Sequence, residues 1–370
     1  MTLMNRITIR RDYKKSHLPT VLIADDTDLP KSGLKMECIG KVFSHVEQKS
    51  ILGFKALMLC WSDGRTQLMV DSSLHGETGK VEGKEQGLTS KQRNARYSRG
   101  RDKDSQTSIR KEEYFKENGD ELKEMLKRAI KNKVPFDYLL VDSWFTCTSL
   151  VDFVCKQHKK FHLPGMAKMG KTKYGAAKWG VLNAKAILRK LDASKSVKTC
   201  HRYKCKYAVY DATLGGHSVR LFFCRRGKSD KWRVLLTTDT KLDFLRAYEI
   251  YAMRWSIEVF FADSKHVLGL AGCSARDFSS QIAHVSMTMI RYNMLAFIKR
   301  SHDYETIGGL FADIYCGVQE LTVVEKIRGI ILEVINVVAE LTGSDEETLM
   351  YQIIENDKRL AALKAYAETS

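Results

Sequence analysis

The chain has 370 residues, 44% of them hydrophobic, which is enough for one large domain with a buried core. Its 61 Lys and Arg against 44 Asp and Glu give a net charge of +17, which favours a polyanionic partner because phosphate neutralisation releases counterions. No apolar run reaches the roughly 18 residues of a membrane-spanning helix, and the start MTLMNRITIRRDYKK lacks an apolar signal segment. A soluble, cytoplasmic protein with no membrane partner is expected, its nine cysteines reduced.

The first predicted elements are strands. Residues 21–25, VLIAD, form a short aliphatic run that ends in an acid and predict a buried strand. Residues 51–61 and 67–70 flank the turn Ser62-Asp63-Gly64, which is typical of a hairpin. Three strands are therefore expected before residue 75.

The amino-acid composition changes at residues 75–111, which are rich in Gly, Ser, Lys and Arg and nearly lack large apolar side chains. This composition predicts a mobile basic loop that contacts the polyanion or is disordered without it. Its four spaced arginines are candidate phosphate ligands: Arg93, Arg96, Arg99 and Arg101.

The next elements alternate between helix and strand. Apolar residues at helical spacing predict a helix over residues 112–131, and residues 136–142 read as a buried strand that ends in Asp142. A helix is expected over 146–157, and Gly-punctuated alternation predicts a β-rich block over about 161–238. From residue 242 onward the pattern is helical.

Four functional side chains share the predicted helix at 242–267. Tyr251, Arg254, Glu258 and Lys265 are spaced by three, four and seven residues, which keeps them within one broad helix face. Arg254 and Lys265 can bind phosphate oxygens and Tyr251 can donate a hydrogen bond, which leaves Glu258 for a divalent metal. The alternative is an ordinary surface ion pair between Arg254 and Glu258.

Three acids lie on three predicted elements: Asp25 and Asp142 end two strands, and Glu258 lies on the helix. They form the smallest set that could hold two Mg²⁺ or Mn²⁺ ions about 4 Å apart, as in-line displacement at phosphorus requires. The alternative for a single Asp at a strand end is a helix cap or a turn former.

The segments around these acids resemble a known family. IADDTDLPKSG at 23–33, YLLVDSWF at 138–145 and YEIYAMRWSIEVFFADSK at 248–265 are similar to the catalytic motifs of bacterial DDE transposases of the insertion-sequence-four group. The third segment fits that group's Tyr-Arg-Glu-Lys motif without a gap. The resemblance runs from about residue 20 to about 300.

The resemblance implies a fold. It implies an α/β protein with a ribonuclease-H-like mixed sheet flanked by helices, a β-rich insertion between the second and third acids, and a helical C-terminal part. The expected divisions are an N-terminal remnant at 1–19, the first part of the core at 20–160, the insertion at 161–240, the rest of the core at 241–300 and a helical region at 301–370.

The resemblance also implies roles for single residues. It assigns Asp25, Asp142 and Glu258 to metal, and it assigns phosphate near the cut to Tyr251, Arg254 and Lys265. Asp26 directly precedes Thr27 and is the alternative to Asp25, although strand alternation favours Asp25. Trp144 is either a base-stacking aromatic or a rim aromatic.

The implied function is metal-dependent cleavage and strand transfer on double-stranded DNA, at element ends and target, by a bacterial protein that associates with the nucleoid. A homodimer on DNA is compatible with this. Because few residues precede Asp25, a truncated copy is also considered. The alternatives are a nuclease on the same fold, which only hydrolyses, and a non-catalytic DNA-binding remnant.

Overall fold

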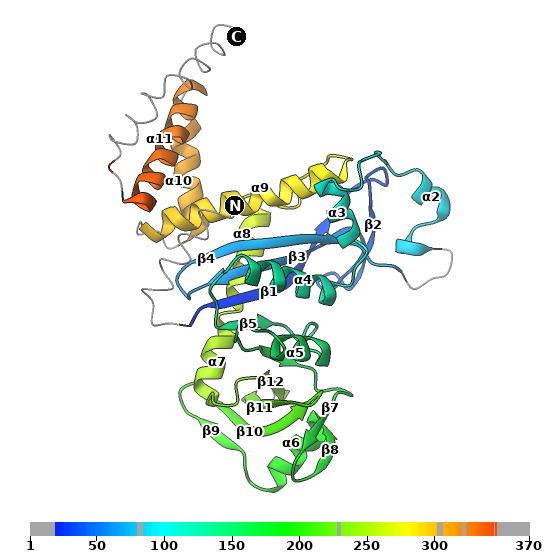
Figure 1. Cartoon of the computed structure of the whole chain (residues 1–370), viewed down its shortest axis with the longest axis vertical. Coiled ribbons are helices and arrows are strands. Elements are labelled where there is room, and N and C mark those ends of the chain that lie inside the picture. The colour runs from blue at the N-terminus through cyan, green and yellow to red at the C-terminus, as the bar shows by residue number, and fades with distance from the viewer. Residues whose placement is uncertain are drawn as a thin grey trace.

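The structure is a computed structural model that describes residues 19–79, 84–227, 231–301, 306–319, 323–343 and 345. Nearly all of the predicted N-terminal remnant, and the end of the predicted helical region from 346 to 370, lie outside these residues. No helix within the described ranges is long and apolar enough to cross a bilayer. The expected mixed α/β class is confirmed (Figure 1).

The first half of the sheet is built around β1 (Val21–Pro30). β3 (Lys49–Ser62) lies antiparallel to β1 on one side, and it also pairs with β2 (Gly40–Ser44) and β4 (Gln67–His75). On its other side β1 pairs in parallel with β5 (Tyr138–Val141), with Ala24 opposite Val141. Because Asp25 and Asp142 directly follow this pair, the backbone brings the first two predicted acids to neighbouring positions.

The second half of the sheet continues from β5, which pairs in parallel with β6 (Pro164–Ala167). The stretch over about 161–238, which was predicted to be rich in strands, does contain strands. In the described part of the chain they belong to one sheet of twelve strands together with the first half. Its further elements are β7 (Lys173–Ala176), β8 (Gly180–Asn183), α6 (Ala184–Ala193), β9 (Lys198–Cys200), β10 (Cys205–Leu214), β11 (His217–Arg226) and β12 (Arg233–Thr237).

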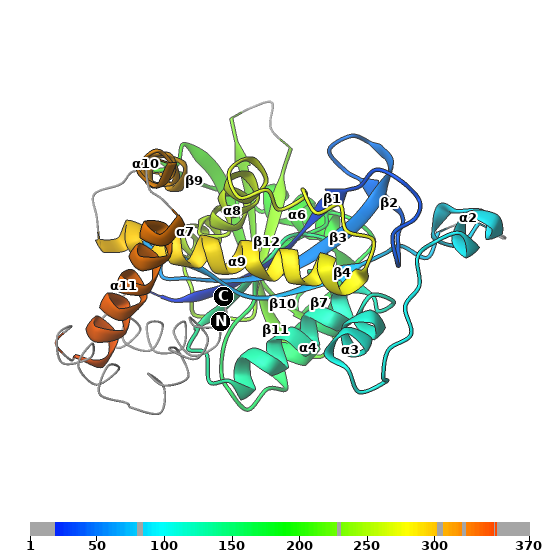
Figure 2. The same cartoon turned by 90° about the horizontal axis from the view of Figure 1, so that it is seen from above.

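Helices cover the first half of the sheet. α4 (Asn118–Lys131) forms because Leu122, Met125, Leu126 and Ala129 recur at helical spacing, and all four are buried. α9 (Phe278–Ser301) runs across the sheet (Figure 2) and packs on β4. The Asn293 side chain donates to Met69 O at 3.0 Å and accepts from Met69 N at 2.7 Å, which pairs a backbone edge that would otherwise be open. The remaining helices are α5 (Thr148–Cys155), α7 (Phe244–Ala252), α8 (Trp255–His266), α10 (Ile307–Gln319) and α11 (Val323–Thr342).

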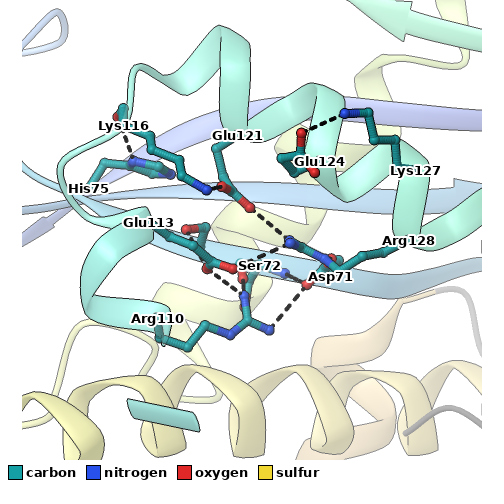
Figure 3. A network of polar contacts seen from close by, with 11 residues as sticks. Asp71, Ser72, His75, Arg110, Glu113, Lys116, Glu121, Glu124, Lys127 and Arg128 are labelled. Atoms are coloured by element: carbon teal, nitrogen blue, oxygen red, sulfur yellow. Dashed lines mark hydrogen bonds and ion pairs between the residues drawn. The ribbon is translucent and has the colours of Figure 1, made fainter. Parts of the chain in front are cut away.

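A polar network joins β4 to α3 (Gln106–Glu113) and α4 (Figure 3). The Arg128 guanidinium contacts three carboxylates, with N–O distances of 2.7 Å to Asp71, 2.9 Å to Glu121 and 3.3 Å to Glu113. Arg110 adds a second guanidinium at 2.9 Å from Glu113. Buried carboxylates are stable only when they are paired in this way, so the network fixes both helices on the sheet.

Residues 75–111, predicted as a mobile basic loop, are largely irregular in their described part. They carry the short helices η1 (Glu85–Gly87) and α2 (Ser90–Asn94) and the first turns of α3, and their mobility stays a prediction. The Thr89 side chain caps α2 in a capping box with Gln92. The capping box and the contacts of the arginines fix parts of this segment. Its composition did not predict these contacts.

Candidate active site

Asp25 lies in the middle of β1 with its carboxylate largely buried. Its Oδ1 accepts the backbone N–H of Asp26 at 2.9 Å, and its Oδ2 accepts Arg254 Nη1 at 2.5 Å. Burial raises the pKa of Asp25 to about 7; Arg254 opposes this rise, and repulsion from Asp142 and Glu258 adds to it. The two other predicted acids therefore lie within electrostatic reach of Asp25.

Asp142 is held at the end of β5 by the backbone that follows it. Its Oδ1 accepts the N–H of Trp144 at 2.8 Å and that of Phe145 at 3.4 Å. These bonds make Asp142 a turn former, as the simpler interpretation of the sequence has it. Both bonds involve Oδ1, and neither of them uses Oδ2.

The third acid reaches the site from a helix that differs from the predicted one. The expected continuous helix over 242–267 is wrong, because α7 ends at Ala252 and α8 begins at Trp255. Between them the N–H groups of Met253 and Arg254 bond to carbonyls three residues back, at 3.1 and 3.0 Å, which is a tighter turn than an α-helix makes.

This turn sets the place of Arg254. Its guanidinium bonds both Asp25 and Glu258 Oε1, the latter at 3.2 Å. The predicted i,i+4 pair between Arg254 and Glu258 thus exists, but it extends to a carboxylate of β1 and is more than a surface pair. Burial raises the pKa of Tyr251 to about 12; Arg254 opposes this rise, and Asp142 and Asp25 add to it. Tyr251 therefore belongs to the same electrostatic cluster.

Lys265 contacts β1 at Thr27, two residues after Asp25. Its Nζ donates to Thr27 Oγ1 at 2.6 Å, and burial lowers its pKa. Thr27 and Asp25 alternate with Asp26 along the strand, so both face α8. Asp26 instead accepts from Asn118 Nδ2 of α4 at 2.9 Å. The structure thus directs Asp25, and not Asp26, toward Arg254 and Glu258.

Comparison with known proteins gives two overlapping family matches. The family described as "DDE superfamily endonuclease" matches residues 7–157, and the one described as "Transposase DDE domain" matches residues 116–294. Both matches are to DDE-type domains, and together they span residues 7–294 of the chain. Domains of this type generally use divalent metal ions. A search of curated proteins gives no match.

Two solved structures are remotely similar to this chain. A piggyBac transposase synaptic complex with hairpin DNA has a TM-score of 0.45 at 14% identity, over 80% of this chain and 51% of that one. The chain thus spans about half of the piggyBac chain's length. The NurA nuclease from Sulfolobus solfataricus has a TM-score of 0.28 at 10% identity, over 78% of this chain and 86% of that one.

The donor chemistry of the three acids fits a divalent ion. Asp25, Asp142 and Glu258 offer only carboxylate oxygens, the ligands that Mg²⁺ and Mn²⁺ prefer, and their mutual repulsion calls for a cation. In the described residues no three His, Cys, Asp or Glu side chains already lie in a metal-holding group. Arg254 holds two of the three acids, so metal binding would require it to release them.

Trp144 is 61% exposed next to Asp142. Lys168 Nζ lies 4.4 Å from its ring centroid, and the His45 ring centroid lies 6.3 Å away. An exposed ring beside one of the acids fits a rim aromatic and also one that stacks on a base, so both interpretations from the sequence stay open.

The four arginines of the basic segment are not equivalent. Arg101 donates to both oxygens of buried Glu37 at 2.8 Å and also to Asp277. Arg96 donates to Ile39 O at 3.0 Å and to Gln86, and Arg93 donates to Leu88 O at 2.7 Å. These three guanidinium groups thus have partners inside the protein, and the assignment of the four arginines to phosphate stays a prediction. Arg99 is 65% exposed at its side chain and contacts Asp277 only at 3.7 Å.

Sequence reasoning missed two polar partners of β1. Lys55 of β3 donates to Asp28 at 2.7 Å, and Asn118 holds Asp26. A signal for Lys55 was available, because it is the one charge inside the apolar run ILGFKALMLCW. Asn118 had no such signal, since its partner lies 92 residues away.

Proposed function

We propose that this chain is a DNA transposase of the insertion-sequence-four group, which cleaves double-stranded DNA at the ends of a mobile element and joins the freed 3′-hydroxyl to target DNA. Its core is then ribonuclease-H-like, and Asp25, Asp142 and Glu258 are its metal ligands. The two family matches support this, as does a mixed sheet in which neighbouring parallel strands deliver the first two acids.

One observation carries the proposal. Asp25, from the start of the chain, bonds Arg254 and is repelled by Asp142 and Glu258. Burying like charges together is costly, and proteins retain such clusters mainly at functional sites. The matching Tyr-Arg-Glu-Lys spacing then gives these side chains their roles.

The residues would act on a DNA phosphate as follows. When bound, two Mg²⁺ or Mn²⁺ ions supply Lewis-acid stabilisation of the charge that develops in an in-line displacement. Arg254, once released from Asp25 and Glu258, donates to a phosphate oxygen, and Lys265 and Tyr251 donate from either side of it. Exposed Trp144 stacks on an unpaired base beside the cut.

The proposal is tested with a labelled duplex that carries the DNA flanking the gene, incubated with a plasmid and Mg²⁺. Cleavage followed by covalent joining of the 3′ end to the plasmid is the expected result. Cleavage without joining would assign the chain to the nucleases instead. Binding without cleavage in either Mg²⁺ or Mn²⁺ would identify a DNA-binding remnant.

A further inference from the structure

The positive charge of the chain is concentrated in one part of it. Residues 161–240 carry 18 of the 61 Lys and Arg but only 4 of the 44 Asp and Glu, which is +14 of the net charge of +17. This count includes residues 228–230, whose one Lys and one Asp cancel. Figure 1 shows α6 and β7 to β12, which belong to this stretch, together at the lower end of the molecule. Such a concentration of one charge favours a polyanion at this end.

Few of these cations are neutralised inside the protein. Among the described Lys and Arg side chains of 161–240, only Arg202 and Arg220 form ion pairs, with Glu249 at 2.9 Å and with Asp211 at 2.6 Å. Acids of the described chain therefore leave most of this positive charge without an offset. The side chains that carry it are available to a ligand.

Four exposed cations of this stretch form a group that we name the basic rim: Lys168, Lys171, Lys173 and Arg233. Lys168 Nζ lies 4.4 Å from the ring centroid of Trp144, which is two residues after Asp142. The antiparallel strands β6 and β12 pair Ala167 with Val234, and this register places Arg233 beside Lys168. Like charges on neighbouring strands repel each other, so the two cations favour an anion between them.

The loop between β6 and β7 holds the basic rim close to the candidate active site. Lys173 is five residues after Lys168, which limits the distance between their Cα atoms to about 18 Å. Lys171 lies between them on the same exposed loop. Phosphates of one DNA strand recur about every 3.4 Å along the helix axis, so side chains this close to one another can contact several of them.

The same loop has the residue spacing of a nucleotide-binding loop but a different structure. Residues 165–172, GMAKMGKT, match the pattern G-x-x-x-x-G-K-T, in which backbone N–H groups hold phosphates at the start of a helix. Here Gly165 is buried within β6, and the strand β7 follows Thr172. The loop therefore lacks the helix N-terminus that holds a nucleotide, and its cations are left for another kind of phosphate.

We infer that the basic rim binds the phosphodiester backbone of duplex DNA beside the candidate active site. DNA as the polyanion rests on the proposed function. That function places Arg254 and Lys265 at the reacting phosphate, so the basic rim adds contacts along the duplex and none at the bond that breaks. Contacts to phosphate position a duplex without reading its sequence, so this binding is independent of the element ends.

The test measures the affinity of the full chain for a fluorescent duplex of random sequence, in EDTA, at several salt concentrations. Lys171→Gln/Lys173→Gln removes two charges at exposed positions. It should reduce the slope of log K against log salt by about two and weaken binding about tenfold or more at about 0.1 M salt. Arg233→Gln, on another element, should reduce the slope by about one.

The matched control is Lys123→Gln/Lys127→Gln, which removes the same charge from α4. Both of these lysines are paired with acids of their own helix, at 2.9 and 2.7 Å, and should leave the slope unchanged. Circular dichroism and urea denaturation verify that every variant is folded. Slopes reduced in both rim variants and kept in the control support the inference. An unchanged slope in either rim variant overturns it, and so does an equal reduction in the control, which would show a response to net charge alone.

Two competitors identify the ligand. Duplex DNA should displace the labelled duplex, and ATP at the same phosphate concentration should not. Displacement by ATP that is lost in Lys171→Gln/Lys173→Gln would assign the loop to a nucleotide and overturn the inference. A loss of affinity confined to duplex RNA of equal length would overturn it too. No cleavage occurs in EDTA, so a chain that fails to cleave or join DNA can still pass this test, and a basic rim that binds no DNA leaves the proposed role of the three acids unaffected.

Discussion

The guanidinium of Arg254 bridges Asp25 and Glu258, with N–O distances of 2.5 and 3.2 Å. A cation of the protein itself thus lies between the first and third acids of the proposed metal site. The structure therefore suggests an exchange, in which metal and DNA together replace the contacts of Arg254: the metal takes the carboxylates and a phosphate takes the guanidinium.

Arg254→Gln should reveal this exchange as a change in the free energy of unfolding. Without divalent metal, Asp25 and Glu258 lose their shared cation, and the free energy of unfolding should fall by about 3 kcal/mol, as for a buried ion pair that loses one partner. Because Mg²⁺ can replace the lost charge, it should stabilise the variant more than wild type. Urea denaturation with and without Mg²⁺ measures both effects.

Arg220→Gln is the matched control. Arg220 is bidentate to exposed Asp211 at 2.6 and 2.8 Å and also donates to Leu242 O at 2.9 Å, so it has no contact with the three acids among its hydrogen bonds. Its loss should cost about 1–3 kcal/mol and should not alter the response to Mg²⁺. An equal Mg²⁺ effect on Arg254→Gln, Arg220→Gln and wild type would show that no exchange takes place.

Arg101 and Arg99 should differ in their contribution to stability. Arg101→Ala removes the bidentate partner of Glu37, which is 2% exposed and keeps Lys111 at 3.0 Å, and it should lower the free energy of unfolding by about 1–3 kcal/mol. Arg99→Ala should change stability by less than about 0.5 kcal/mol, because the side chain is exposed. If urea denaturation shows equal stability for both variants, the Glu37 contact has no structural role.

His75 should make the fold sensitive to acid. Burial lowers the pKa of His75 to about 4 from its ordinary 6.5, and its Nδ1 lies 3.2 Å from Lys116 O (Figure 3). Between these values the unfolded chain takes up a proton that the folded chain does not. The contribution of His75 to the free energy of unfolding is therefore fully present above pH 6.5. This contribution is lost as the pH falls from 6.5 toward 4, by up to about 3 kcal/mol.

His75→Asn keeps a donor for the Lys116 carbonyl and removes the titration. The difference in unfolding free energy between wild type and this variant should therefore change across pH 6.5 to 4, even though nearby carboxylates titrate in both proteins. A difference that stays constant with pH would contradict the assignment of this acid sensitivity to His75.

The strands that carry the first two acids were readable from the sequence, because local hydrophobic runs determine them. Residues 21–25 and 136–142 were predicted as strands ending in acids, and Val21–Pro30 and Tyr138–Val141 are strands. The predicted end at Asp25 is wrong, because β1 continues to Pro30. The parallel pairing of these strands was not readable, since the first run ends at residue 25 and the second begins only at residue 136. Non-local pairing follows from tertiary packing, which periodicity does not report.

The helix break and the partners of the arginines were not predicted for the same reason. No Gly or Pro marks the break at Met253 and Arg254, so periodicity predicted one helix where two helices meet in a tight turn. The arginines of the basic segment looked free because their partners are remote: Glu37 and Asp277 lie 64 and 176 residues from Arg101. Local composition cannot show such pairs.

The central claim is that Asp25, Asp142 and Glu258 form one metal-dependent site for DNA cleavage. The most direct test compares cleavage of the flanking-DNA duplex in Mg²⁺ by Asp25→Asn, Asp142→Asn and Glu258→Gln, with Asp26→Asn as the matched control that faces α4. Each of the three variants should bind DNA at least as tightly as wild type while cleavage falls by several orders of magnitude, and Asp26→Asn should cleave within about tenfold of wild type. Wild-type cleavage by any of the three, or cleavage by Asp25→Asn when Asp26→Asn is inactive, would contradict the site.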